Sequence, residues 1–470
     1  MTTTEWKNPV SGDFNHASNW TAGVPAAGDT ALITASGTYT VTSSQANSVG
    51  TLEMVKDATL AISSSTDLDV TSDTVTGVLA GTITVAALAT LGLGTDATNT
   101  TYDNTGTIDL STATLSAIGA VTLTGKGKVS LSHSTIQSAN PAATLTNDST
   151  ISGGGDISFT SGFANAAKGV VDANSSIFDL TIYSLNTTNS GLMEATTGSG
   201  FLWIVADVTQ TAKGQIKAAT SGAQVYLSNG ITITGGVIST VAGSSLDAGT
   251  GTNTLSPTTP ITNDGTIDTD SGNFVINGSV KGAGTLLAAD SNFITVTGAV
   301  TGGKADIEGA GEINIDGKSS VAVTFSPGST GMLTLGDATK FTGTVAGMST
   351  APGAAIDLTN IFFADITSSD VNFSPTKHLL TVFDPASSVT DKIKISGSAG
   401  TFTPSLASDG TTLISDPPAS PESVPHANTD LLAQSMASFG ASSSIVGSGT
   451  GSLAEHHTSS DFLAVNSHHG

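Results

Sequence analysis

The chain has 470 residues, and 38% of them are hydrophobic, so it can bury a core. Only 11% of residues are charged, the net charge is −24, and all 14 basic residues are lysines. So acidic a chain repels nucleic acid and anionic lipid, which argues against a nucleic-acid partner. Cysteine is absent, which excludes disulfides, thiolate zinc sites and cysteine nucleophiles.

The start of the sequence, MTTTEWKNPVSGDF, contains no basic segment followed by an apolar one, so no cleavable signal peptide is predicted. The longest apolar stretches, residues 83–93 and 201–206, are shorter than the roughly 20 residues that a membrane-spanning helix needs. We therefore expect no membrane span, and export by a route other than an N-terminal signal.

Residues 1–38 differ in composition from the rest of the chain. Trp6 and Trp20 bracket a loop rich in Pro, Gly and Asn, and strand-like alternation begins after it. A solenoid has an open end that must be covered. We predict that residues 1–38 form an N-terminal cap closed by the two Trp rings. The alternative is that the two rings bind a glycan.

Residues 39–335 are repetitive. A phrase of the form Asn-x-Gly/Ser-x-Ile/Leu begins at Asn104, Asn147, Asn189 and Asn263. The first two spacings between these Asn residues are nearly equal, and the third is longer. A shorter repeat, about half as long as the first spacing, is also present. Alternation of β-branched residues with polar ones, broken by Gly, Asn and Asp, predicts short strands and turns.

Val275, Ile294 and Ile313 are equally spaced in the sequence. So regular a period favours a parallel β-helix with coils of about 20 residues, about 15 of them in a rod of about 70 Å. We predict that these three residues form one inward ladder. A tandem of antiparallel β-sandwiches is the alternative fold.

Glycines recur at fixed phases of the same repeat. Gly278, Gly298 and Gly317 share one phase, and Gly282 and Gly302 share another. A corner that turns within two residues needs a positive φ, which glycine adopts without steric cost. We interpret these glycines as corner residues of the coils.

The C-terminal part changes twice. Residues 336–416 have longer strands and more Phe, and are predicted to form the final coils and a C-terminal cap. Residues 417–470 contain a Pro-rich linker, a short amphipathic stretch and a Ser/Gly-rich tail that we expect to be flexible.

The two ends resemble those of a known family. The resemblance rests on the opening NPVSGDFNHASNWTAGVPAAGDTALI, on VAVTFSPGSTGMLTLGDATKFTGTVAGM and on the Asn-x-Gly-Thr-Ile coils. These are similar to large secreted β-helical repeat proteins of alphaproteobacteria, of the rhizobial type. The resemblance implies a right-handed parallel β-helix at the cell surface or in the medium, with a role in adhesion in some members, and no established catalytic residues.

The same resemblance implies export by a type I secretion apparatus that reads the C-terminal tail. The stretch SSDFLAVN, which contains Asp461, Phe462, Leu463 and Val465, is similar to such a tail. The glycine- and aspartate-rich nonapeptide of type I-exported toxins is not present, and SGGGDIS at 152–158 is an incomplete copy. We therefore predict no cofactor, and support for calcium is weak.

Three classes of function compete for this chain. A polysaccharide lyase commonly needs Arg beside carboxylates, and a hydrolase needs clustered carboxylates. Asp67 and Asp69 share one face of a strand, with Asp73 nearby, and we interpret them as solvated decoration. Five of the eight His lie after residue 420, where paired His could bind a transition metal weakly, but no metal site is predicted.

We predict a secreted, non-enzymatic β-solenoid that acts as a structural or adhesive surface or matrix protein. Its expected partners are extracellular polysaccharide, a cell surface or copies of itself. The alternatives are a surface-layer or matrix subunit that polymerises, and a polysaccharide-active enzyme on a β-helix.

Overall fold

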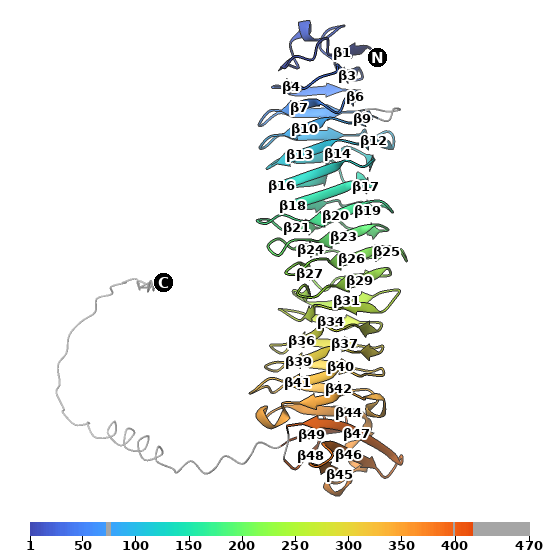
Figure 1. Ribbon diagram of the computed structural model, residues 1–470. Helices are drawn as coiled ribbons and strands as arrows, with labels where there is room; N and C mark the ends of the chain where they lie inside the picture. The colour runs from blue at the N-terminus through green and yellow to red at the C-terminus, as the bar shows by residue number, and fades with distance from the viewer. Residues whose placement is uncertain (72–76, 398–399, 417–470) are drawn as a thin grey trace, which may run out of the picture. The chain divides into compact units, whose positions relative to one another are not determined.

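The computed structural model describes residues 1–71, 77–397 and 400–416, which belong to one compact unit. The unit is an all-β parallel solenoid of about 15 turns, with roughly 21 residues per coil (Figure 1). The predicted fold class is confirmed, and the antiparallel β-sandwich is wrong for this part of the chain. No helix in these residues is long and apolar enough to cross a membrane.

Each regular coil contributes one strand to each of three parallel ladders. Ladder 1 consists of β1 (Thr3–Glu5), β3 (Thr30–Ile33), β6 (Thr51–Met54), β9 (Gly77–Leu79), β12 (Thr100–Asn104), β15 (Ala120–Thr124), β17 (Thr144–Asn147), β19 (Phe163–Asn165), β22 (Thr187–Asn189), β25 (Val208–Gln210), β28 (Thr232–Thr234), β31 (Thr252–Ser256), β34 (Asn273–Ile276), β37 (Phe293–Val296), β40 (Glu312–Ile315), β42 (Met332–Leu335) and β44 (Ala355–Phe362). Ladder 2 consists of β2 (Gly12–Asp13), β4 (Tyr39–Ser43), β7 (Ala58–Ile62), β10 (Thr82–Val85), β13 (Thr107–Ser111), the first parts of β16 (Lys128–Ser138) and β18 (Thr150–Ser158), β20 (Val170–Ala173), β23 (Leu192–Ala195), β26 (Gln215–Ala218), β29 (Val237–Thr240), β32 (Ile261–Asn263), β35 (Val280–Lys281) and β38 (Val300–Thr301).

Ladder 3 consists of β5 (Asn47–Val49), β8 (Asp67–Val70), β11 (Thr90–Leu93), β14 (Thr114–Ala117), the second parts of β16 and β18, β21 (Leu180–Ile182), β24 (Leu202–Ile204), β27 (Gln224–Leu227), β30 (Ser245–Ala248), β33 (Thr266–Asp268), β36 (Thr285–Ala288), β39 (Lys304–Ile307), β41 (Ala322–Phe325), β43 (Thr344–Ala346) and β47 (Val389–Ser396). The long strands β16 and β18 run through the corner between ladders 2 and 3, with a register shift between Ser132 and Ser134.

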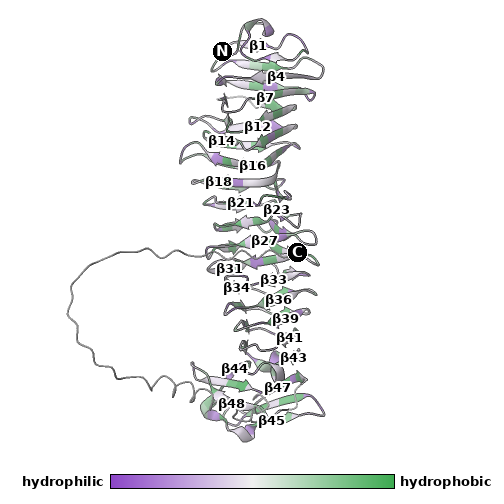
Figure 2. Ribbon diagram, turned by 90° about the vertical axis from the view of Figure 1, so that its left-hand side faces the viewer, coloured by the Kyte–Doolittle hydropathy of each residue, from purple (hydrophilic) through white to green (hydrophobic). Residues whose placement is uncertain are grey.

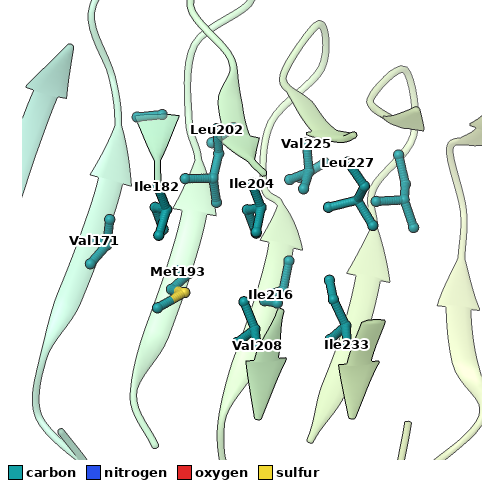
Figure 3. Packing of buried hydrophobic residues seen from close by; sticks show 14 of the residues in the cluster. Val171, Ile182, Met193, Leu202, Ile204, Val208, Ile216, Val225, Leu227 and Ile233 are labelled. Carbon is teal, nitrogen blue, oxygen red and sulfur yellow. The ribbon is translucent and has the colours of Figure 1, made fainter. Parts of the chain in front are cut away.

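Alternation along these strands builds the core. One side chain in two points inward and is buried, and its neighbours point out. Figure 3 shows how the inward residues of successive coils stack, for example Ile182, Ile204 and Leu227 from ladder 3. Apolar residues recur in this way in strands all along the rod (Figure 2). The interior is therefore a column of stacked apolar rows, continuous from Trp6 to Ile414.

The predicted inward ladder is wrong at one residue. Ile294 pairs with Ile313, as expected, but on the other side it pairs with Phe274 rather than Val275. Val275 points outward beside Thr295. The coil from Phe274 to Ile294 has one residue more than the next coil, and a shift of one residue reverses the face of a strand. Equally spaced residues in the sequence therefore do not all point to the same face of their strands.

Buried amides form a second kind of ladder inside the corner between ladders 1 and 2. The Nδ2 of Asn147 donates to Oδ1 of Asn165 over 2.9 Å, and Asn165 donates likewise to Asn189. Asn189 donates to Oε1 of Gln210 over 2.9 Å, and Gln210 donates to the carbonyl of Gly235. All four side chains are buried, so their stacking satisfies amides that would otherwise each cost about 1–3 kcal/mol.

The Asn phrase found in the sequence occupies two different corners. Asn104, Asn147 and Asn189 end strands of ladder 1, whereas Asn263 ends β32 of ladder 2. This explains why the last gap of the phrase is not a whole number of coils. Asn104 lies outside the amide ladder. Its side chain is buried and has no hydrogen-bond partner in the described chain, because Gly125 and Gly127 lie over it in the next coil.

The recurring glycines have two separate causes. Gly282 has a φ of 126°, as the corner interpretation requires. Gly302 also has a positive φ, but Gly278, Gly298 and Gly317 do not, and the interpretation is wrong for these three. A Cβ on Gly317 would lie 2.3 Å from the carbonyl oxygen of Gly298. At this corner glycine is needed because stacked backbones approach too closely for any side chain.

Residues 1–29 form an irregular first coil that covers the end of the rod. Its strands β1 and β2 pair with β3 and β4. Trp6 and Trp20 pack edge to face, with ring centroids 5.1 Å apart, and are only 2% and 1% exposed. Their indole N–H groups donate to the carbonyls of Val10 and Phe14. Regular coils begin at Thr30 rather than at residue 39, because β3 pairs on both sides.

At the other end the parallel pattern stops. The strand β44 is still parallel to β42, but it pairs in antiparallel fashion with β49 (Thr411–Ser415), which also pairs with β48 (Thr403–Leu406). Antiparallel pairing also joins β45 (Val371–Ser374), β46 (Leu379–Asp384) and β47. Short 3₁₀ helices lie in both end regions, at Ala17–Asn19, Ala338–Lys340, Met348–Thr350, Phe363–Asp365 and Ser368–Asp370. The switch to antiparallel strands gives the predicted C-terminal cap its structure.

The corrected register can be tested with two neighbouring substitutions. Phe274→Ala removes a fully buried ring and is expected to lower the free energy of unfolding by about 3–5 kcal/mol. Val275→Ala, on the outward face, is expected to lower it by less than about 1 kcal/mol. Urea denaturation followed by circular dichroism compares the two. A larger loss for Val275→Ala would restore the register expected from the sequence.

Candidate functional site

The residues singled out in the sequence do not meet in one site. Trp6 and Trp20 are buried with both indole N–H groups satisfied, so neither presents a ring face to a sugar. Asp67 and Asp69 point outward from β8 as expected, and Asp73 lies outside the described residues. The proposed secretion tail, with Asp461, Phe462, Leu463 and Val465, and the five late His residues also lie outside them.

A surface patch on ladder 3 gathers the outward aromatic residues of the middle of the rod. Of the three Trp, Trp203 alone points outward, from β24. Of the four Tyr, Tyr39 and Tyr102 are buried, whereas Tyr183 is 47% exposed and Tyr226 is partly exposed. The aromatic patch, as we call it, consists of Phe178, Tyr183, Phe201, Trp203 and Tyr226.

Coil stacking holds the patch together. Trp203 and Tyr226 are register partners on adjacent strands, with ring centroids 5.9 Å apart and planes at 85°. Phe201 stacks on Tyr226 at 6.3 Å, and the Tyr226 hydroxyl donates to Oδ2 of Asp270 over 2.8 Å. The buried indole N–H of Trp203 has no acceptor among the described residues. The rings of Phe201, Trp203 and Tyr226 are thus held side by side on the sheet.

A groove borders the patch on the same three coils. It encloses about 820 Å³ at the corner between ladders 3 and 1, within the range of ligand sites. Leu185, 56% exposed, and Val205 give it an apolar wall, and Asn186, Asp207 and Asn229 give it polar groups. Leu185 is two residues from Tyr183, and Val205 is two residues from Trp203. The groove therefore begins where the strands β21 and β24, next to Tyr183 and Trp203, end.

Carboxylates continue the outward row beyond the aromatic rings. Tyr226 is followed in register by Asp247 and Asp268 on the next two coils. Burial raises the pKa of Asp247 to about 7; the Asp268 and Asp270 charges add to the rise, and a hydrogen bond from Ser245 opposes it. Burial and the neighbouring Asp270 also raise the pKa of Asp268. Near neutral pH, Asp247 can both donate and accept hydrogen bonds.

This arrangement suits recognition of a polyhydroxylated chain. Aromatic rings offer apolar faces to sugar rings, and carboxyl, amide and hydroxyl groups around them match sugar hydroxyls. Within residues 1–71, 77–397 and 400–416, no three His, Asp or Glu side chains are placed to hold a metal ion.

The apolar segment FLWIVA, residues 201–206, is too short for a membrane span, and its length alone gives no sign of the patch. Read by alternation, it places Leu202 and Ile204 inside and Trp203 outside, which the structure confirms. The outward orientation of Trp203 can therefore be predicted from the sequence. Its ring partners cannot, since Tyr226 lies a full coil away and the coil lengths vary.

No protein-family model, curated protein or solved structure matches the chain.

The raised pKa of Asp247 predicts a pH-dependent effect of Asp247→Asn. An Asp with a higher pKa in the folded than in the unfolded state destabilises the fold when ionised, so the penalty is full above about pH 7 and vanishes below about pH 4. The variant is expected to be more stable than the wild type at pH 8, by about 1–3 kcal/mol, and equally stable near pH 4. Denaturation curves at the two pH values measure the difference. A gain that does not change with pH would show that ionisation of Asp247 is not its cause.

Proposed function

We propose that this protein is a secreted structural or adhesive rod that contacts extracellular polysaccharide through the aromatic patch and its groove. The observation that carries the proposal is the concentration of the outward Trp and both exposed Tyr on three successive coils of ladder 3. An exposed aromatic surface is unfavourable in water unless a partner covers it. Repetition of the coil gives the rod the length over which many weak contacts add.

Two other functions have particular support. A surface-layer or matrix subunit would need contacts between copies, and the capped ends would direct these to the sides of the rod. A polysaccharide-cleaving enzyme would need paired carboxylates that differ in pKa, and Asp247 and Asp268 lie on adjacent strands. We favour binding because the groove that borders the rings contains a single carboxylate, Asp207, which has no second carboxylate there to share acid and base roles.

A matched pair of exposed aromatic residues tests the binding surface. Tyr183→Ala removes a ring in the patch, and Phe362→Ala removes one that is 58% exposed on the last parallel strand of ladder 1. In affinity electrophoresis against a panel of soluble polysaccharides, Tyr183→Ala and Trp203→Ala are expected to weaken binding at least tenfold, which corresponds to about 1.4 kcal/mol. Phe362→Ala is expected to bind like the wild type.

The outcomes separate the three functions. Equal binding by all variants would remove the patch from the proposal. Lateral polymers in electron micrographs without binding of any polysaccharide would support the subunit. Release of new reducing ends or unsaturated sugars from the panel would support the enzyme.

Export is the second part of the proposal and rests on the resemblance of the C-terminal tail to type I secretion signals. Deletion of residues 456–470 is expected to retain the protein in the cytoplasm of the native host, because it removes the export signal. The variant is expected to fold, because the deletion leaves all three ladders intact. Deletion of residues 1–29, which removes the cap, is expected to leave export unchanged. Immunoblots of cells and medium measure both. Wild-type amounts of the C-terminal deletion variant in the medium would overturn this part.

A further inference from the structure

A second groove, nearer the N-terminus than the aromatic patch and at a different corner of the rod, concentrates positive charge. It encloses about 530 Å³ at the corner between ladders 1 and 2 and is lined by Lys56, Lys126 and Lys128. All three lysines are exposed. We call it the lysine groove. It holds three of the 14 lysines of a chain whose net charge is −24.

The floor of the lysine groove is kept hollow by glycine. Gly81, Gly106 and Gly127 occupy equivalent places in three coils. A Cβ on Gly106 would lie 1.9 Å from the carbonyl oxygen of Gly81, and one on Gly127 would lie 2.3 Å from that of Gly106. Close stacking of the backbones therefore excludes side chains at these three positions, which we call the floor. The lysines and the hydroxyl residues Thr82, Thr105, Thr107 and Thr150 also line the groove, and we call them its rims.

The lysines of the groove have no carboxylate within ion-pair distance among the described residues. No ion pair joins any of the three to a carboxylate in the described part of the chain, where the single ion pair is that of Lys340 with Asp337. The same coils carry several carboxylates, among them Asp57, Asp103, Asp109 and Asp148, but none of these four lines the groove. Three cations around a side-chain-free floor repel one another, and an anionic ligand would relieve this repulsion.

The dimensions of the groove indicate the kind of anion. Its lining residues come from five successive coils, from Lys56 to Thr150, which at about 4.8 Å per coil gives a length of about 19 Å along the rod axis. A small anion would occupy only one part of it. A second rod would present a flat sheet face, which does not enter a groove at a corner of the coils. A linear chain with charges spaced along it fits the length and the shape.

We propose that the lysine groove binds an anionic polysaccharide, through carboxylate or sulfate groups paired with Lys56, Lys126 and Lys128. Sugar hydroxyls bind the threonine rim, and the glycine floor lets the sugar chain lie close to the backbone. The acidic remainder of the rod repels the same polymer, so binding is confined to this groove. The site is separate from the aromatic patch and does not depend on the function proposed for it.

Two triple variants with the same change of charge test the proposal. Lys56→Gln/Lys126→Gln/Lys128→Gln alters the groove, and Lys377→Gln/Lys392→Gln/Lys394→Gln alters three exposed lysines near the C-terminal cap. Binding of polygalacturonate, dextran sulfate and neutral dextran is measured by biolayer interferometry at low and at moderate salt. The groove variant is expected to bind the anionic polymers at least tenfold more weakly than the control variant, and salt is expected to weaken wild-type binding. Polygalacturonate and dextran sulfate distinguish carboxylate from sulfate as the preferred group.

Three results would overturn the proposal. These are equal losses in the two triple variants, no binding of either anionic polymer by the wild type, and self-association of the wild type that the groove variant abolishes. The last result would identify a second copy of the chain as the occupant. The variant Tyr183→Ala is included in each assay; its unchanged binding of anionic polymer would show that the two surfaces act independently.

Discussion

Parallel hydrogen bonding between successive coils is the constraint on which the other features depend. It holds each backbone about 4.8 Å from the next, so every side chain contacts its own equivalents in the coils above and below. A side chain that points inward must pack against the equivalent side chains of the neighbouring coils. This yields apolar rows such as Phe274, Ile294 and Ile313. A buried amide is tolerated where its neighbours are amides, and glycine is required where backbones meet at a corner. The aromatic patch arises in the same way on the outer face, where residues of successive coils lie next to one another.

Repetition of the coil also groups ordinary outward-pointing residues into distinct surfaces. A single outward Tyr or Lys on a sheet would be solvated and ordinary. Trp203 and Tyr226 become a platform because they share a register, and three lysines become a cationic site because glycine stacking leaves a hollow between them. The two surfaces differ in charge and in chemistry, although the same coil geometry creates both. A rod of this kind can therefore carry several chemically different surfaces without a separate domain for each.

The sequence was sufficient to predict the fold class and the length of the coil, because both depend on the mean period and on alternation. It was insufficient for the orientation of individual residues, because corners differ by a residue or more and each difference reverses a face. Val275 was misplaced for this reason, and the phrase at Asn263 was grouped with copies that lie at another corner. The aromatic patch could be inferred in part from alternation in residues 201–206. The lysine groove could not, since Lys56 and Lys126 are separated by several coils whose lengths must all be known.

The amide ladder restricts where such a rod can end. Every amide from Asn147 to Gln210 donates toward the C-terminal side, so each one needs a partner in the following coil. Loss of one internal coil would bring another amide into place and preserve the chain of donors. A terminus introduced after Asn165 would instead leave a buried donor facing the end. Evolution and protein engineering can thus change the length of this segment by whole coils, but a cap can be attached only outside it.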